Sequence, residues 1–130
     1  METKKVLLQR RIKPAEDRNF IIEMTKGDRM ALASQYGFDA ISSLRGSFVI
    51  RPDKKIVPCY FLEGVIDATL IDQKEEVVLS ELLSLYLVKN ESDLEKFSLE
   101  DDVEILDPDG TVDIGDIMGQ YVYLAVMEAE

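Results

Sequence analysis

The sequence predicts an α+β fold, in which a strongly curved antiparallel sheet of about six strands carries two packed helices. Several runs of β-branched, aromatic and aliphatic residues show the period-two pattern of strands and are separated by short turn signals. Two segments, 26–36 and 114–127, have capping residues and helical spacing instead. The 130 residues match the usual length of one domain, so we expect 1–130 to form a single domain.

The N-terminal part predicts two short strands and then a capped helix. The strands are expected at 4–12 and 20–24, which are rich in β-forming residues. Thr25 fits an N-cap, because its hydroxyl can accept from the Asp28 amide while the Asp28 carboxylate accepts from the Thr25 N–H. Gly37 suits a left-handed residue that ends the helix.

One face of this helix is expected to be buried. Met30, Ala33 and Gly37 follow helical spacing and mark the buried face. The face that carries Lys26 and Arg29 is then expected to be exposed to solvent.

The middle of the chain predicts strands joined by tight turns. Residues 43–51 and 56–71 are expected to form an antiparallel hairpin around the turn at 52–55. Apolar residues occur on both sides of the longer strand: Val57, Cys59, Phe61 and Val65 on one side, and Ile56, Tyr60, Leu62, Ile66, Ala68 and Leu70 on the other. A further turn is expected at 72–76. The run at 77–88 fits both a helix and a strand, and we favour a strand because it follows its neighbour after a short turn.

The C-terminal part predicts a hairpin and a final helix. Residues 89–102 are polar and acidic, with one helical turn after Ser92. The segments 103–106 and 111–114 flank DPDG, whose Pro and Gly suit a tight turn, so they are expected to pair as a hairpin. Asp113 can cap a helix from about residue 114 to 127. Its apolar stripe consists of Ile114, Ile117, Met118, Tyr121, Val122 and Ala125.

Charge is distributed unevenly along the chain. The net charge is −11. Residues 1–55 contain 12 Lys and Arg against 7 Asp and Glu, a net of +5, whereas residues 56–130 contain 3 against 19, a net of −16. Such asymmetry points to a polar partner. If that partner is RNA, the N-terminal part must make the contacts, because the remainder repels phosphate.

Two sets of residues are therefore candidates for partner binding. The candidate RNA-binding residues are Lys4, Lys5, Arg10, Arg11, Lys13, Arg18, Lys26, Arg29, Arg45, Lys54 and Lys55. The candidate residues for a basic protein partner are Asp101, Asp102, Glu104, Asp107 and Asp109. In a third interpretation, these charges keep a small protein soluble and bind nothing. Nearby aromatic residues suit the core better than base stacking: Tyr36, Phe38 and Phe48.

The residue types argue against catalysis. One Cys and no His fit a reducing cytoplasm, exclude an internal disulfide and disfavour zinc. Cys59 has no His to activate it as a nucleophile. The DPDG region also fails as a calcium loop, because aligning Gly110 with the loop glycine puts Ile105 at the first ligand position and Asp116 at the last, where Ca²⁺ loops need an acidic residue and a Glu.

We therefore expect a cytoplasmic protein that is not an enzyme and has no cofactor, metal or small-molecule substrate. No run of 18 or more apolar residues occurs, so we expect no membrane partner either. The first 13 residues also lack the long apolar segment of a signal peptide.

The order of short residue patterns resembles a known family. Asp28-Arg29, Ala31-Leu32-Ala33, Gly37-Phe38 and Leu44 are followed by Gly64, Ile66, Ala68 and Leu70 at alternate positions. The tail DDVEILDPDGTVDIGDIMGQYVYLAV then combines an acidic turn with a capped helix. In this order the chain resembles the large ribosomal RNA subunit accumulation proteins, the YceD-type family formerly listed as domain of unknown function 177, over nearly its whole length.

The resemblance has departures and an implication. Asp72 stands where the family usually has Gln, the turn after it lacks the family Cys, and the proline-containing end of the family is missing. The resemblance implies a non-catalytic factor that supports accumulation or processing of large-subunit ribosomal RNA by binding precursor RNA or a maturation protein. The alternative is an acidic adaptor that binds a basic ribosomal protein or nuclease without contacting RNA.

Overall fold

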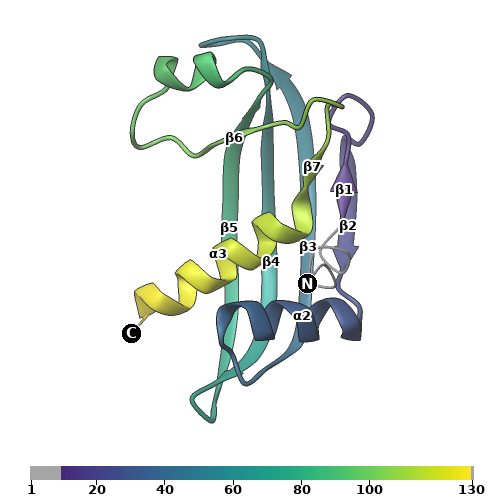
Figure 1. The fold of residues 1–130 in the computed structure, drawn as a ribbon, viewed down its shortest axis with the longest axis vertical. Coiled ribbons are helices and arrows are strands. Elements are labelled where there is room, and N and C mark those ends of the chain that lie inside the picture. Colours follow the sequence, from purple (N-terminus) through teal and green to yellow (C-terminus); the bar gives the residue numbers. More distant parts are fainter. Residues whose placement is uncertain (1–9, 130) are drawn as a thin grey trace.

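The computed structural model describes residues 10–129 and has the α+β fold that the sequence predicts (Figure 1). In chain order the elements are β1 (Arg11–Ile12), β2 (Asn19–Glu23), α2 (Lys26–Tyr36), β3 (Ala40–Asp53), β4 (Cys59–Asp72), β5 (Glu75–Val88), the 3₁₀ helix η1 (Glu91–Lys96), β6 (Val103–Ile105), β7 (Val112–Asp113) and α3 (Ile114–Ala129). Of the strand expected at 4–12, the described part is β1, and residues 4–9 lie outside the described residues.

The sheet differs from the expected one in number and direction of strands. Within residues 10–129, five strands form one sheet in the order β2-β3-β4-β5-β6, and β1 pairs with β7 in a separate two-stranded sheet. Neighbours from β2 to β5 are antiparallel, but β6 runs parallel to β5. The predicted single antiparallel sheet of about six strands is therefore corrected to a five-stranded mixed sheet and a two-stranded one.

The antiparallel hairpin expected from 43–51 and 56–71 is confirmed, but its turn lies at 54–58 and not at 52–55. β3 and β4 each have 14 residues and pair antiparallel from Ala40↔Ile71 to Asp53↔Cys59. β5 is a strand, which settles the ambiguity of 77–88, and it pairs with β4 through a two-residue turn. That turn is Gln73-Lys74, with φ of 52° and 68°. The Lys74 N–H donates to the Asp39 carboxylate at 2.8 Å, which holds a left-handed turn that non-glycine residues rarely adopt.

Helix α2 begins and ends where the sequence predicts, but its buried face is rotated. The Thr25 hydroxyl accepts from the Asp28 amide at 3.1 Å, and Gly37 is left-handed with φ of 78°. Leu32 is fully buried, whereas Met30 is 63% exposed, so the prediction for Met30 was wrong. Ala33 is buried as predicted, but Gly37 is exposed, so the prediction was wrong for Gly37 too. The other buried residues of α2 are Asp28, Ala31 and Leu32, because this side of the helix faces α3, where Leu32 lies against Gly119.

Both helices pack on the same face of the sheet (Figure 1). The Asp113 carboxylate accepts from the Asp116 amide at 3.1 Å, so the predicted cap of α3 is confirmed. Of the apolar stripe, Ile114, Ile117, Met118 and Val122 are buried, while Tyr121 and Ala125 are half-buried. The two helices meet at Gly119, where a Cβ would lie 2.7 Å from the Leu32 side chain. No helix of residues 10–129 is long and apolar enough to cross a membrane.

The predicted hairpin at 103–114 is only half correct. The turn forms, with the Gly110 amide donating to the Asp107 carbonyl at 2.8 Å and Gly110 at a φ of 81°. Its flanking strands do not pair with each other, because β6 joins β5 and β7 joins β1. Leu106 and Val112 are both buried. β6 and β7 thus each pair with a strand that lies further away in the sequence, and the predicted hairpin between them does not form.

The most buried aromatic side chain depends on a neighbouring glycine. Phe48 of β3 is fully buried and lies opposite Gly64 of β4. A Cβ at Gly64 would lie 2.5 Å from the Phe48 ring and 2.4 Å from the Ser47 carbonyl oxygen. Only glycine leaves room for the ring here.

Candidate functional site

Arg10 is an internal contact of the fold. Its guanidinium donates from Nε and Nη2 to Asp28 Oδ2, at 3.0 and 2.5 Å. Asp28 is buried, being only 5% exposed, and it also accepts from the Thr25 amide at 3.4 Å. A buried carboxylate needs such a partner, so the charge of Arg10 neutralises Asp28 at the start of α2.

Arg11 and Arg29 are also used inside the fold. Arg11 forms an ion pair with Asp107 and donates from Nε to Thr111 Oγ1 at 3.0 Å, which ties β1 to the turn before β7. Arg29 donates to the carbonyls of Met24 and Ile41 at 2.8 and 3.1 Å. Arg29 is half-buried, so the expectation that its face of α2 is exposed was wrong for this residue.

The other candidate cations are scattered. Lys13 lies 3.8 Å from Glu16, and Lys26 is exposed at the start of α2. Arg45 is exposed on β3, in register with Glu23 of β2 and Asp67 of β4. Lys55 is exposed in the turn after β3, while Lys4 and Lys5 lie outside the described residues. Lys26 lines a second, smaller pocket together with Arg29, whereas Lys13, Arg45 and Lys55 line neither this pocket nor the one described next.

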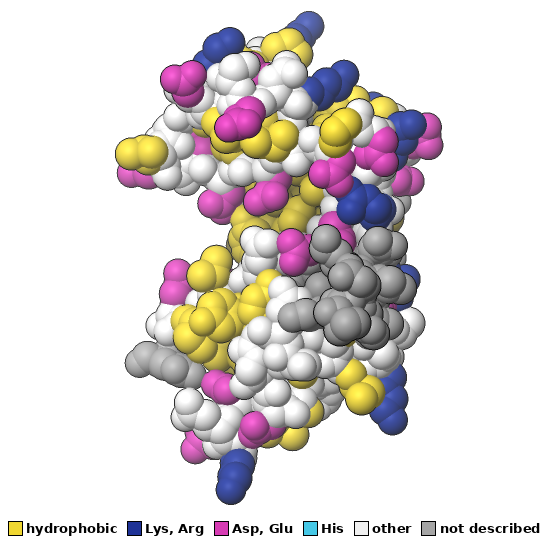
Figure 2. Space-filling view, viewed as in Figure 1, with side chains coloured by type: hydrophobic (Ala, Val, Ile, Leu, Met, Phe, Trp, Pro, Cys, Tyr) yellow, Lys and Arg dark blue, Asp and Glu magenta, His cyan; other side chains and the backbone are white. Residues whose placement is uncertain are grey.

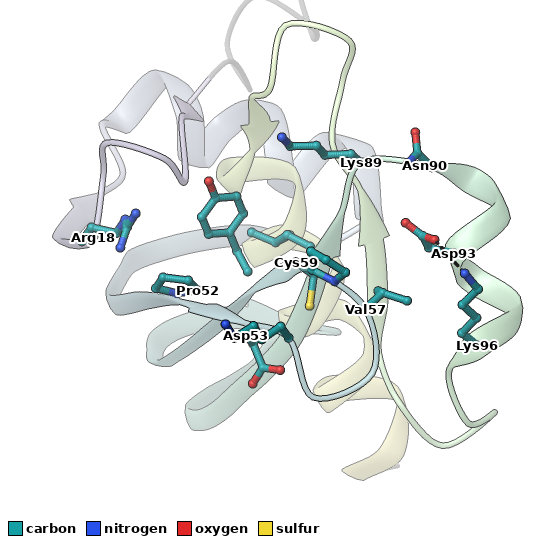
Figure 3. Close-up of a pocket in the computed structure, with 13 residues that line it drawn as sticks. Arg18, Pro52, Asp53, Val57, Cys59, Lys89, Asn90, Asp93 and Lys96 are labelled. Carbon is teal, nitrogen blue, oxygen red and sulfur yellow. Dashed lines mark ion pairs between the residues drawn. The ribbon is translucent and has the colours of Figure 1, made fainter.

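Two of the candidate cations do meet, in a pocket at one end of the long strands (Figure 3). Arg18 precedes β2 and Lys54 lies in the β3–β4 turn, and the chain after β5 adds Lys89 and Lys96. The cavity has a volume of about 620 Å³. We call it the basic pocket and define it by its lining residues Arg18, Pro52, Asp53, Lys54, Val57, Pro58, Cys59, Tyr60, Leu87, Lys89, Asn90, Asp93 and Lys96.

The basic pocket combines positive charge with an aromatic wall. Its four cations exceed its two carboxylates, Asp53 and Asp93, giving a net of +2 in a chain of net −11. The Arg18 guanidinium carbon lies 5.7 Å from the centre of the Tyr60 ring, a cation–π distance, and its Nε donates to the Pro14 carbonyl at 2.9 Å. Asp93 lies 3.7 Å from Lys96. The arrangement suits an anionic group beside a flat ring.

The thiol in this pocket is not prepared for nucleophilic chemistry. Burial raises the pKa of Cys59, and the nearby carboxylates of Asp53 and Asp93 raise this pKa further. A raised pKa keeps the thiol protonated, whereas a reactive cysteine needs a lowered one. Within residues 10–129, no group of three potential metal ligands comes together. The excess of cations in the lining suits an anion.

The candidate acidic residues divide into two groups. Asp107 pairs with Arg11, and Asp109 accepts from the Thr111 amide and hydroxyl at 3.1 and 2.6 Å, so both stabilise the turn before β7. These hydrogen bonds from Thr111 lower the pKa of Asp109. Asp101 accepts from the Ser98 amide at 3.1 Å.

Asp102 and Glu104 instead border a hollow between β6 and α3. We call this hollow the acidic groove; it has a volume of about 150 Å³ and is lined by Leu85, Asp102, Val103, Glu104, Ile117, Gln120, Tyr121 and Leu124. In Figure 2 it is visible left of centre, with hydrophobic side chains inside and acidic ones on its rim. The Tyr121 hydroxyl donates to Asp102 Oδ2 at 2.7 Å.

Sequence reasoning missed Lys89 and Lys96. Both lie in the acidic part of the chain, so counting charges by segment hides them. Only the pairing of β4 with β5 brings the end of β5 beside the β3–β4 turn. The alternating pattern of β5 indicated that it is a strand able to pair with β4. The sequence did not indicate that the C-terminal end of β5 lies near Arg18.

Comparison with known proteins gives no match: no family model, no curated protein and no solved structure is significantly similar to the chain. The resemblance to the YceD-type family therefore stays a prediction based on the residue patterns given above.

Proposed function

We propose that this protein is a cytoplasmic, non-catalytic factor that supports the accumulation or processing of large-subunit ribosomal RNA, and that it contacts precursor RNA through the basic pocket. The observation that supports an RNA contact is that Arg18, Lys54, Lys89 and Lys96 line the same pocket as Tyr60. The YceD-type residue patterns support the ribosomal context.

The physical argument is local charge. A chain of net −11 repels RNA over most of its surface, so binding requires a region where cations are in excess and not already neutralised. Lys54 and Lys89 have no ion pair within residues 10–129. Lys54 and Lys89 are also exposed, so their ammonium groups can reach a phosphate.

Tyr60 provides the second part of an RNA contact. Single-stranded RNA is commonly bound by aromatic or guanidinium planes on which a base can stack. Tyr60 is half-buried and has Arg18 over its ring. A single-stranded segment with one base near this pair and its phosphates near the lysines fits the pocket.

The test compares two triple variants that remove equal charge. The first, Lys54→Ala with Lys89→Ala and Lys96→Ala, empties the pocket of lysines. We expect it to weaken binding of a single-stranded precursor-rRNA fragment at least tenfold. The salt slope should fall by about 1.4 units, since the unpaired Lys54 and Lys89 each lose one phosphate contact and each contact to a single strand contributes about 0.7, whereas Lys96 already pairs with Asp93. Filter binding at several salt concentrations measures both.

The control is Lys13→Ala with Lys26→Ala and Lys74→Ala, three exposed lysines that do not line the pocket. It should change RNA affinity by less than about threefold. Equal losses of RNA affinity in the two variants would mean that RNA is attracted by overall positive charge. The proposal that the basic pocket contacts RNA would then be wrong.

The adaptor alternative, a basic protein partner without RNA, is favoured by the net −16 of residues 56–130. If wild-type protein fails to bind RNA even at low salt, the RNA proposal ends and the adaptor remains. Crosslinking in cells, with sequencing of bound RNA and identification of bound proteins, then separates the two.

A further inference from the structure

The acidic groove has an apolar floor with a charged rim. Leu124 of α3 is 54% exposed and provides aliphatic surface beside the buried Leu85 and Ile117. Asp102 and Glu104 stand on its β6 side, and no Lys or Arg is among its lining residues. An exposed aliphatic surface of this kind is suited to a partner that brings aliphatic side chains of its own.

Strand β6 offers unpaired main-chain groups beside this floor. It lies at the edge of the five-stranded sheet and pairs only with β5 among the described strands. The Asp102 carbonyl accepts from the Tyr86 amide, and the Leu106 amide donates to the Val88 carbonyl. Since neighbouring residues of a strand point their main-chain groups to opposite sides, those of Val103 and Ile105 face away from β5, where another strand can pair with them.

The rim carries negative charge that lacks a cationic partner in the groove. Glu104 is half-buried, and burial, followed by the charges of Asp116 and Asp102, raises its pKa. Three carboxylates close together repel one another. A cation from a partner would remove this repulsion, whereas RNA would increase it.

We propose that the acidic groove binds an extended segment of a partner protein in which Lys or Arg alternates with aliphatic residues, added as a strand to the free edge of β6. The main chain of the segment pairs with Val103 and Ile105. Its Lys or Arg side chains point to the α3 face, where their methylene stems pack on Leu124 and their charges contact Asp102 and Glu104. Its aliphatic side chains point to the opposite face of the sheet, beside Val103 and Ile105. This surface is separate from the basic pocket, so the inference stands or falls independently of RNA binding.

The probe is a fluorescein-labelled peptide of alternating Lys and Val, about eight residues long, titrated by fluorescence anisotropy. Asp102→Asn with Glu104→Gln should weaken its binding at least tenfold. The matched control, Glu91→Gln with Glu95→Gln, removes two exposed charges from η1 and should change affinity less than about threefold. Equal losses would show that the peptide follows net charge alone, which overturns the proposal.

A second probe tests the strand pairing itself. The same peptide with alternate N-methylated residues keeps its charges and side chains but loses the N–H groups that would donate to β6. Its binding should fall at least tenfold, and unchanged binding would overturn strand addition.

Two further measurements separate this proposal from others. RNA affinity of the Asp102→Asn, Glu104→Gln variant should be unchanged or slightly higher, so failure of RNA binding leaves the groove proposal intact. Analytical ultracentrifugation identifies the remaining occupant: a dimer that the same variant dissociates would assign the groove to a second copy of this chain and overturn the peptide proposal.

Discussion

The cations at the start of α2 and the cations of the basic pocket have the same formal charge but different surroundings. Arg10 donates twice to the buried Asp28, and Arg29 donates to two main-chain carbonyls. Lys54 and Lys89 instead border an open cavity. The first group stabilises the fold, and the second remains free to meet a ligand. A basic segment in a sequence therefore indicates how many positive charges are present, but not how many of them are free to bind a ligand.

Arg10→Met tests the stabilising group most strongly. It leaves the Asp28 carboxylate buried without its cation, and breaking such a pair is strongly destabilising. We expect the free energy of unfolding to fall by about 2–4 kcal/mol, somewhat less than for a fully buried pair because Arg10 is partly exposed. Urea denaturation measures the change. Arg45→Met, which removes an exposed cation, is the control and should change the free energy by less than about 0.5 kcal/mol. A loss below about 1 kcal/mol for Arg10→Met would mean that the fold does not depend on the Arg10–Asp28 ion pair, and that Arg10 is available to bind a ligand.

Arg29→Ala should have a smaller effect of the same kind. It removes two charged hydrogen bonds to the carbonyls of Met24 and Ile41, which join the end of β2 to the start of β3. We expect a loss of about 1–2 kcal/mol in thermal or chemical unfolding. Lys26→Ala, on the same helix but exposed, should be nearly neutral, and similar losses in the two variants would show that Arg29 acts only by its charge.

The smallest effect concerns the acidic side of the molecule. The raised pKa of Glu104 means that the folded protein disfavours its ionised form, so its stabilising contribution is complete below the ordinary value of 4.5 and is lost as pH rises through the raised pKa. At pH 7, Glu104→Gln should raise Tm by less than about 4 °C. The difference from wild type should disappear below about pH 4.5.

Differential scanning calorimetry from pH 4 to pH 8 follows this difference. Glu95→Gln, at an exposed position, is the control and should show little dependence on pH. A Glu104→Gln advantage that increases toward acid pH would mean that the environment of Glu104 stabilises its charge.

Local signals predicted much of the fold. The Thr25–Asp28 cap, the Gly37 stop and the Asp113 cap depend on contacts within a few residues, so the sequence reveals them. The alternation of β4 likewise placed Leu62 and Leu70 on the same side of the strand, and both are fully buried. The pairing partners of β6 and β7 could not be predicted from the sequence. These strands have three and two residues, which is too few to show an alternating hydrophobic pattern, and their positions depend on strands distant in the sequence.

The candidate site was less predictable for the same reason. Arg18 and Lys54 were named from the sequence as part of a long basic segment, but nothing local distinguishes them from Arg10 or Arg11. What separates these residues is whether Asp28 or Asp107 lies within reach in three dimensions. Local composition does not carry that information.

The contact between Phe48 and Gly64 also specifies how β3 and β4 align. Long antiparallel strands of similar composition can slide by two residues and still keep their apolar side chains on the inner face. Such a shift would bring Leu62 or Ile66 opposite Phe48, where their side chains would occupy the space that the ring fills. Because Gly64 has no side chain, β3 and β4 can pair in only this register. The register in turn determines which residues of the β3–β4 turn reach the basic pocket.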